Sequence, residues 1–286
     1  MQIIKHYRNE KTLRDSFNAL AEATFGLNFE NWYRMGFWTD NYAPYSVLAD
    51  GKIVANVSVN RTDMVIGGHR RRLYQLGTVM TDPAYRNRGY IRAIMAEVEK
   101  DISDADGVYL FANDSVTEFY PKFGFVPGKE YLYEKALSQQ GENRMRQVIM
   151  DREEPIRKLR EAMAGNVFET ACRMVDNAGL VFFYAAQFLC ENVYYWEEQD
   201  VWAIAELEDG QLLLHEVFAS GTVTLDAVIG AFGADVKTVT LGFAPEDPES
   251  WTCREYREED CHFFVRGEIF REFPERNLRI PTLSHA

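Results

Sequence analysis

Hydrophobic and polar positions along the first half of the chain alternate between helical and strand periodicity. Apolar residues between 10 and 25 recur at helical spacing. Asp50-Gly51 is a strong hairpin signal between two strand-like runs. The predicted elements are strands at 2–7, 45–49, 53–59, 71–80, 108–112 and 131–137, helices at 10–25 and 89–102, and shorter helical pieces within 29–38 and 115–123. This order predicts an α/β (α+β) unit whose mixed sheet is mostly antiparallel.

The second half repeats that order in weaker form. The predicted elements are helices at 153–164, 167–178 and 224–232, an apolar segment at 180–193, and strands at 201–208, 211–218 and 237–243. Asp209-Gly210 again marks a hairpin, and Thr222 or Thr224 is expected to cap the helix that follows. The polar run after Leu137 is the expected boundary, so we predict domains at 1–137 and 153–286 joined by a linker at 138–152.

Composition narrows the class of protein. The chain has 286 residues, a length that suggests two domains, with 47% hydrophobic and 26% charged residues. It contains no apolar run of about 18 residues, as a membrane helix would need, and no signal-like start, so a cytoplasmic protein is expected. Four scattered cysteines predict free thiols and no metal site. An oligomer is compatible with these features.

The formal net charge of −13 argues against nucleic acid as a partner, because phosphate contacts require basic patches. An acidic surface would attract a cationic small-molecule amine. The same acidity also serves solubility alone, so this inference leaves both explanations open.

Residues 76–95 carry the clearest chemical signal. A predicted strand runs through Asp82-Pro83 into a loop that contains arginines and Gly89, and the loop leads directly into an amphipathic helix. The helix start offers free backbone N–H groups and a positive dipole end, and glycine lets the backbone approach an anion closely. The segment therefore predicts a pyrophosphate-binding loop. The alternative is a helix start decorated by solvated arginines.

The run Arg86-Asn-Arg-Gly-Tyr-Ile91 resembles the acetyl-CoA motif of the GCN5-related N-acetyltransferase (GNAT) superfamily, Gln/Arg-x-x-Gly-x-Gly/Ala, with Ile91 in place of Gly or Ala. With Arg92 it is similar to the enhanced-intracellular-survival branch, which acetylates amines. That branch pairs an N-terminal acetyltransferase domain with a degenerate acetyltransferase-like half. The resemblance implies a GNAT fold followed by a degenerate GNAT-like α/β half, which has no Arg/Gly loop and is not expected to bind coenzyme A.

The resemblance also implies acetyl-CoA as co-substrate, without a metal. The donor-binding residues it implies are Thr78, Val79, Met80, Arg86, Asn87, Arg88, Gly89, Tyr90, Ile91, Arg92 and Asn113. A backbone N–H near Val79 would stabilise the oxyanion. Residues 113–125 resemble the superfamily's Asn…Tyr-x-x-x-Gly-Phe segment, which makes Tyr120 the general acid. The alternatives are a plain core strand at 78–80 and a packed aromatic at Tyr120.

The acceptor site and the base are less defined. We expect a pocket for an ammonium group, with aromatic side chains on its walls and carboxylates at its entrance. Its residues would be Phe29, Glu30, Trp32, Trp38, Asp40 and Tyr42. The alternative is that these aromatics belong to the core. Candidates for the base are Glu30, Asp40 and, by the resemblance, the terminal carboxylate of Ala286.

The sequence therefore predicts an N-acetyltransferase that transfers acetyl from acetyl-CoA to the primary amine of a small cationic acceptor. An alternative is a coenzyme A-binding regulatory or scaffold protein without turnover. A third interpretation is a similar enzyme that uses a different acyl donor.

Overall fold

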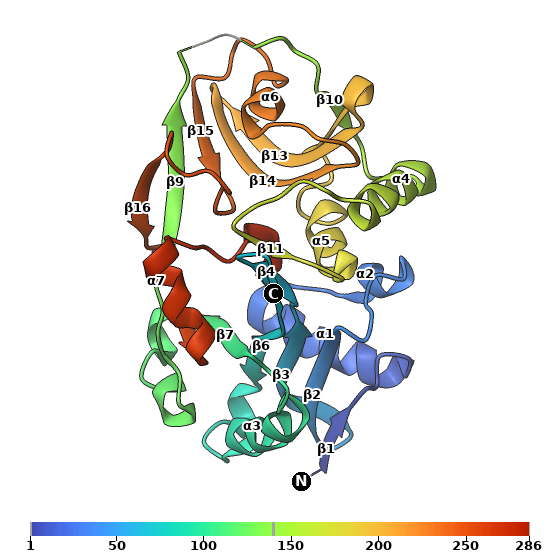
Figure 1. Ribbon diagram of the computed structural model, residues 1–286. Helices are drawn as coiled ribbons and strands as arrows, with labels where there is room; N and C mark the ends of the chain where they lie inside the picture. Colours follow the sequence, from blue (N-terminus) through green and yellow to red (C-terminus); the bar gives the residue numbers. More distant parts are fainter. Residues whose placement is uncertain (1, 139–140, 286) are drawn as a thin grey trace.

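The computed structural model describes residues 2–138 and 141–285. The described residues form two seven-stranded sheets and one three-stranded sheet. Figure 1 shows the two large sheets one above the other, with the first half of the chain below and most of the second half above. Among the described residues, no helix is both long and apolar enough to cross a bilayer.

The first half is built around β3, which is buried along almost its whole length. Its helices are α1 (Lys11–Phe25), α2 (Glu30–Arg34) and α3 (Tyr90–Asp101), and its strands are β1 (Gln2–Lys5), β2 (Tyr42–Ala49), β3 (Lys52–Arg61), β4 (Met64–Ile66), β5 (His69–Arg71), β6 (Leu73–Thr81), β7 (Gly107–Ala112), β8 (Val126–Pro127) and β9 (Glu130–Ala136). Phe17 of α1 and Ile94 of α3 are fully buried in different apolar clusters, so both faces of the sheet are covered.

The second half repeats the arrangement of the first. Its helices are α4 (Glu153–Ala164), α5 (Ala178–Ala185), α6 (Leu225–Gly230) and α7 (Glu272–Arg276), and its strands are β10 (Arg146–Val148), β11 (Cys172–Met174), β12 (Val193–Trp196), β13 (Val201–Glu208), β14 (Gln211–Ala219), β15 (Thr238–Leu241), β16 (Thr252–Tyr256) and β17 (His262–Arg266). β13 and β14 form the predicted hairpin, and β14 then pairs in parallel with β15, as β6 does with β7. The predicted fold class, with two GNAT-like bodies, is confirmed.

Several local predictions agree with the structure in detail. Helix α4 spans the predicted residues, and the side chain of Thr224 caps α6 by accepting a hydrogen bond from Ala227 N at 3.2 Å. The predicted helix at 167–178 is wrong. There β11 pairs with β4, and α5 begins only after Asn177, whose side chain accepts a bond from Leu180 N. Pairing with a distant strand overrides the local periodicity.

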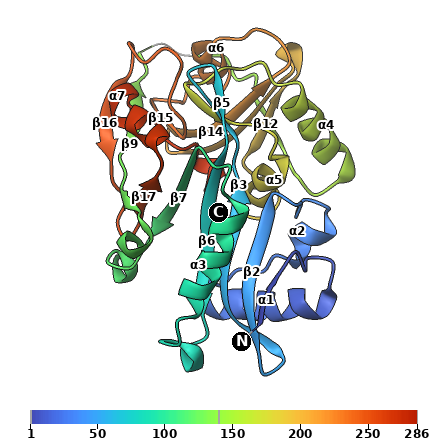
Figure 2. The ribbon, with the colours of Figure 1, turned by 60° about the horizontal axis from the view of Figure 1, so that its bottom comes forward.

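The two large sheets exchange one strand each. β9, predicted to close the first sheet, pairs with β15 and β16 in the second, while β17 lies between β7 and β8 in the first. β10, inside the predicted linker, pairs with β12. Figure 2 shows β17 beside β7 from a second direction. The sheets therefore do not follow the predicted division at 137 and 153, because each half contributes a strand to the other.

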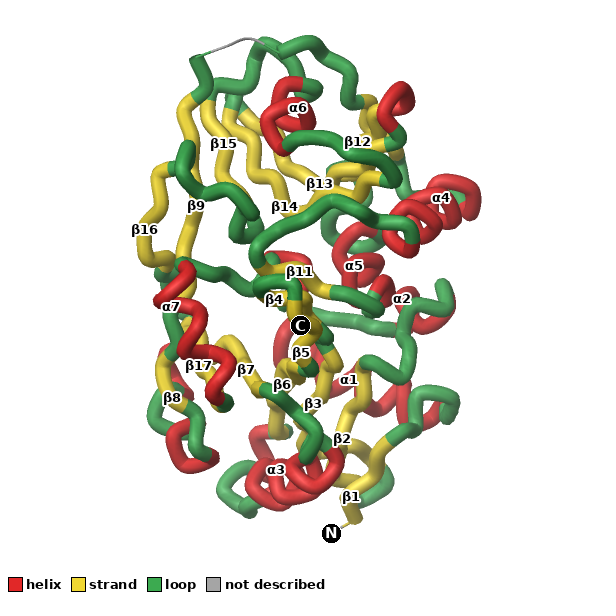
Figure 3. The backbone as a smooth tube through the Cα atoms, viewed as in Figure 1, coloured by secondary structure: helices red, strands yellow, loops and turns green. Residues whose placement is uncertain are grey.

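The C-terminal segment runs between the halves and is hydrogen-bonded to both. The Leu278 carbonyl of this segment accepts a hydrogen bond from Tyr131 N, and its Ile280 N donates one to the Glu130 side chain at 2.9 Å. Further on, Thr282 N donates to Gly242 O at 2.8 Å. Ser284 Oγ lies 3.5 Å from Met174 Sδ of β11, and Figure 3 shows β11 and β4 in the middle of the molecule.

Glu130 also makes this connection sensitive to pH. Burial raises the pKa of Glu130 to about 7, although Arg279 opposes the shift. Between about pH 4.5 and pH 7 the folded protein keeps a proton that the unfolded chain has lost. The free energy of unfolding should therefore fall as pH rises through this window, and stay level above it.

Glu130→Gln should remove this dependence, because the amide oxygen can still accept from Ile280. We expect the variant to exceed wild type in unfolding free energy by about 1–3 kcal/mol at pH 8, with little difference at pH 4.5. Urea denaturation at both pH values measures this. Glu134→Gln, an exposed change on the same strand, is the control and should shift stability by less than about 1 kcal/mol. An equal effect of Glu130→Gln at both pH values would contradict the assignment.

Candidate active site

The candidate site begins where β6 and β7 separate. Their parallel pairing runs from Leu73–Gly107 to Gln75–Tyr109 and ends there, although β6 continues to Thr81 and β7 to Ala112. Beyond Gln75 the two strands therefore diverge, and the backbone of β6 faces open space on that side. A wedge of this kind can admit an extended ligand between two strands.

A bulge at Thr78 bends β6 at this point. The register against β3 shifts between Asn56 and Ser58, and Thr78 has a φ of +46°, in the left-handed region. A non-glycine residue is strained there unless its surroundings hold it. Asn56 Nδ2 donates to the Thr78 carbonyl at 2.9 Å, and the hydroxyls of Thr78 and Tyr42 are hydrogen-bonded at 2.5 Å.

The bulge rests on a buried chain of polar groups. The Tyr7 and Ser46 hydroxyls are 2.7 Å apart, Ser46 Oγ donates to Asn56 Oδ1 at 2.8 Å, and Asn56 Nδ2 donates to Ser58 Oγ at 2.9 Å. Burial raises the pKa of Tyr7 well above its ordinary value, so this hydroxyl remains a proton donor. Because these polar groups are satisfied internally, the network fixes the bulge rigidly.

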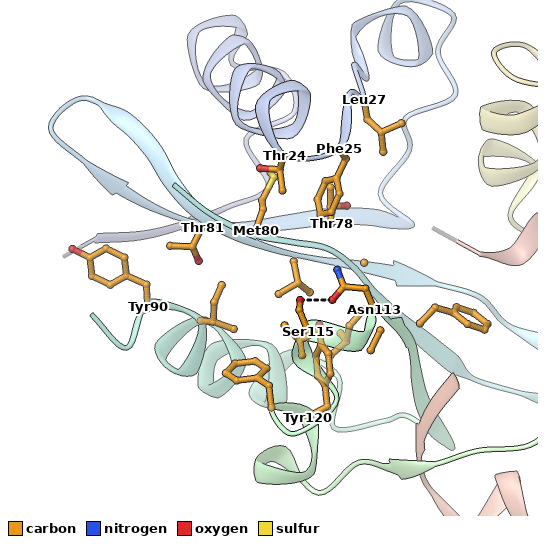
Figure 4. A pocket seen from close by; sticks show the side chains of 18 of the residues that line it. Thr24, Phe25, Leu27, Thr78, Met80, Thr81, Tyr90, Asn113, Ser115 and Tyr120 are labelled. Carbon is orange, nitrogen blue, oxygen red and sulfur yellow. Dashed lines mark hydrogen bonds between the residues drawn. The ribbon is translucent and has the colours of Figure 1, made fainter. Parts of the chain in front are cut away.

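A cavity of about 1240 Å³ occupies the wedge and extends past both of its ends. Its lining includes Thr78, Val79 and Met80 of β6, as predicted. Figure 4 shows Thr78 and Met80 in its middle, between Tyr90 on one side and Leu27 on the other. The cavity thus has two ends that differ in chemistry.

One end, here called the arginine end, comprises residues 86–92. All seven residues line the cavity, including Arg86, Arg88 and Arg92. None of these three arginines forms an ion pair with a described residue. Arg88 donates to the Ala84 carbonyl at 3.0 Å and lies over the Tyr85 ring. Three positive charges without an acidic partner among the described residues, in a protein of net charge −13, favour an anionic ligand.

The backbone at the arginine end is also suited to an anion. Gly89, at the N-cap of α3, has a φ of +75°, and a Cβ there would meet open space. The first turn of α3 contains no acidic residue and no side chain caps it, so an anion would meet no competing group at the start of this helix. Ile91, which replaces the motif's Gly or Ala, packs partly against the core and also lines the cavity.

Tyr120, the predicted general acid, and Asn113, a predicted donor-binding residue, line the cavity on the β7 side. Tyr120 begins the 3-10 helix Tyr120–Phe123 and is almost fully buried against Phe125 and Phe264. Burial raises the pKa of Tyr120 to about 12, so its hydroxyl carries a proton at neutral pH. The Asn113 side chain accepts a bond from Ser115 Oγ at 2.7 Å (Figure 4).

The opposite end, here called the aromatic end, comprises Phe25, Phe29, Trp32, Phe183, Tyr184 and Phe188. The predicted Phe29 and Trp32 lie here, and Tyr42 lines the cavity beside Thr78. No pattern in the sequence predicted that α5 and the turn after it, in the second half, contribute the last three residues. The apolar run at 180–193 was the available signal, but its partner lies far away in the sequence.

Three predicted acceptor residues do not line the cavity. Glu30 is held by the Arg14 guanidinium at 3.0 Å, a bond that also lowers the pKa of Glu30. Asp40 is exposed and pairs with Arg8, while Trp38 is buried in the core with its Nε1 donating to Tyr42 O. The expected carboxylates, Glu30 and Asp40, are therefore absent from the described lining of the cavity.

The end of the chain approaches the same cavity. The Ser284 carbonyl accepts from the Tyr109 hydroxyl at 2.8 Å, and the His285 carbonyl accepts from the hydroxyl of Tyr184. The His285 ring stacks on Phe111, which lines the cavity, with centroids 3.9 Å apart. Ala286, predicted as a catalytic residue, lies outside the described residues. Within those residues, no group of three or more His, Cys, Asp or Glu side chains is placed to hold a metal ion.

Comparison with known proteins gives the class. Residues 7–128 match the family described as "Acetyltransferase (GNAT) domain". A probable N-acyltransferase from Enterococcus faecalis, 17% identical, shares the fold with a TM-score of 0.61 over 93% of this chain and 71% of its own. A GCN5-related N-acetyltransferase from Kribbella flavida, also 17% identical, has a TM-score of 0.53 over 93% and 72%.

Eis1 from Mycobacterium abscessus is 14% identical, with a TM-score of 0.56 over 92% of this chain and 73% of its own. No curated protein matches the sequence significantly. Residues 7–128 therefore form a domain of the GNAT acetyltransferase family, and nearly the full length of the chain shares its fold with these solved structures. The resemblance inferred from residues 86–92 and 113–125 is confirmed.

The arginine end yields a direct test of anion binding. Arg88→Glu should weaken acetyl-CoA binding about 10–100-fold, because a charged hydrogen bond is replaced by repulsion. Gly89→Trp should also weaken it, because the side chain would occupy the open space and strain the left-handed backbone. Isothermal titration calorimetry measures both. Arg157→Glu, on the exposed face of α4, is the control, and unchanged affinity in both site variants would show that the donor binds elsewhere.

Proposed function

We propose that the protein is an N-acetyltransferase that moves the acetyl group of acetyl-CoA to the primary amine of a small molecule. The observation that carries this proposal is the wedge between β6 and β7, which joins an unpaired arginine loop to an aromatic compartment within one cavity. Acetyl-CoA has a polyanionic end, which suits the arginine end of the cavity. Its other end is a neutral thioester, which suits the aromatic end.

The donor's pyrophosphate would bind at the arginine end, against the start of α3. Its pantetheine arm would then run along β6 past Thr81 and Met80, which places the thioester near the bulge. There a backbone N–H near Val79 would donate to the thioester oxygen as negative charge develops on it. A donor held in advance by a rigid bulge is the arrangement that stabilises an oxyanion most effectively.

Tyr120 would protonate the departing thiolate. Its burial supports this role, since a pKa of about 12 keeps the phenol protonated across the neutral range. The acceptor nitrogen would approach from the aromatic end, opposite the arginine loop. This direction separates the amine from the donor's phosphates.

Incubation with acetyl-CoA and an amine panel, with free thiol and acetylated product measured together, tests the proposed function. Thiol release that depends on the amine, with matching product, is expected. Binding of acetyl-CoA without product from any amine would favour the alternative of a regulatory coenzyme A-binding protein. Propionyl-CoA in parallel tests the choice of acyl donor.

Tyr120→Phe removes a single hydroxyl and preserves the buried ring. Turnover should fall about 100-fold or more, as for the loss of a positioned general acid, with acetyl-CoA affinity nearly unchanged. Steady-state kinetics and calorimetry measure the two effects. Tyr195→Phe, which removes a hydroxyl that bonds Asp200 away from the cavity, is the control and should retain turnover. Full activity in Tyr120→Phe would reduce this residue to a packing role.

The base that takes the amine proton remains a separate proposal. In a chain that ends at Ala286, the terminal carboxylate would follow directly on His285, whose ring stacks on the cavity residue Phe111. This position supports the terminal carboxylate more than Glu30 or Asp40, neither of which lines the cavity.

Amidation of the Ala286 carboxyl by semisynthesis removes the charge and keeps the packing of the tail. We expect turnover to drop about 10-fold or more while the melting temperature and acetyl-CoA affinity stay the same. A semisynthetic protein with a free carboxylate is the control. Equal turnover of the two proteins would eliminate the terminal carboxylate as base.

A further inference from the structure

The aromatic end of the cavity also bears on which amine is accepted, an inference that rests on the proposed function. Its rings belong to both halves of the molecule and contact one another. Phe29 stacks on Phe183 with centroids 5.3 Å apart, and Phe183 packs against Phe188 at 5.4 Å. The compartment is therefore a continuous apolar wall.

The charges around the cavity do not suit a polycation. The described lining contains no Asp or Glu, and its ionised side chains are Arg86, Arg88 and Arg92. Glu30, the predicted carboxylate partner for an ammonium group, is paired with Arg14 instead. An acceptor with several ammonium groups would meet no counter-charge from these side chains.

The polar groups of the compartment already have partners within the protein. Trp32 Nε1 donates to Gly179 O at 2.7 Å, and the Tyr184 hydroxyl donates to His285 O. The Thr24 hydroxyl donates to Leu20 O at 2.8 Å. A polyhydroxylated or polyamine acceptor would therefore lose its hydrogen bonds to water without replacing them here.

Two of these rings are exposed. Phe25 is 45% exposed and Phe188 is 53% exposed, and they come from opposite halves of the chain. Figure 4 shows Phe25 projecting from the end of α1 toward Thr78, where the acyl group is proposed to lie. Large exposed aromatic surface beside a cavity is typical of a site that an apolar ligand covers.

We infer that the acceptor is a monoamine with an apolar body, of the arylalkylamine class. Its ring or chain lies against the aromatic end, and its amino group reaches the bulge. Apolar surroundings favour the neutral amine over the ammonium ion, and the neutral form is the nucleophile. The nitrogen forms the C–N bond as the C–S bond breaks, the thiolate gains one proton, and the new amide nitrogen releases one.

The test compares amines of different polarity at saturating acetyl-CoA. With 2-phenylethylamine, spermidine and glucosamine as probes, kcat/KM should be at least about 10-fold higher for 2-phenylethylamine. A preference for spermidine or glucosamine would overturn this inference and leave the proposed function standing. Bound acetyl-CoA with no acetylated product from any probe or from a wider amine panel would overturn both.

Substitutions at the aromatic end then test whether the body of the acceptor binds there. Phe188→Asp should lower kcat/KM for 2-phenylethylamine about 10-fold and raise it for spermidine, because it adds a carboxylate to the apolar wall. Phe25→Asp repeats the test from the first half, and thermal melting confirms that both variants fold. Val167→Asp is the matched control, since Val167 is 51% exposed and does not line the cavity. Unchanged selectivity in both phenylalanine variants would overturn the assignment.

Discussion

The separation of β6 from β7 depends on the bulge at Thr78, and the cavity depends on that separation. A strand that leaves its neighbour exposes backbone groups that would otherwise complete a ladder, which is unfavourable unless something holds the strand in place. Here the Thr78 carbonyl is bonded by Asn56, and Asn56 is itself held by Ser46 and Ser58. The wedge is therefore a property of the sheet's interior and exists before any ligand enters it.

The second half shows the same wedge put to another use. β14 continues past the end of its pairing with β15, as β6 does with β7, but the gap is filled. A Cβ on Gly242 would lie 2.4 Å from Thr282 Oγ1, and that hydroxyl is hydrogen-bonded to His215 at 2.9 Å. The chain's own C-terminal segment thus occupies the space that a ligand would need. The wedge between β6 and β7 thus contains a cavity. The corresponding wedge beside β14 and β15 contains the C-terminal segment, which continues toward that cavity.

Local signals predicted most of the helices and strands and the arginine loop. These signals, such as the Asp-Gly turns, the cap at Thr224 and the motif at residues 86–92, depend only on residues a few positions away in the sequence. Prediction failed where distant segments decide the outcome. Residues 172–174 form a strand because Met64–Ile66 lies beside them, and β9 and β17 exchange sheets. In the site, sequence spacing could not show that Arg14 holds Glu30 or that Phe183 and Phe188 reach the cavity.

The exchange of β9 and β17 has a consequence for how the protein is made. β7 ends at Ala112, and the strand that pairs with its outer edge begins at His262, 150 residues later. At a synthesis rate of about 5–20 residues per second, that edge would stay unpaired for roughly 8–30 s. An unpaired strand edge can join with other chains. During about half of its translation the nascent protein can therefore associate with other chains through this strand edge, and its first sheet is completed only late in synthesis.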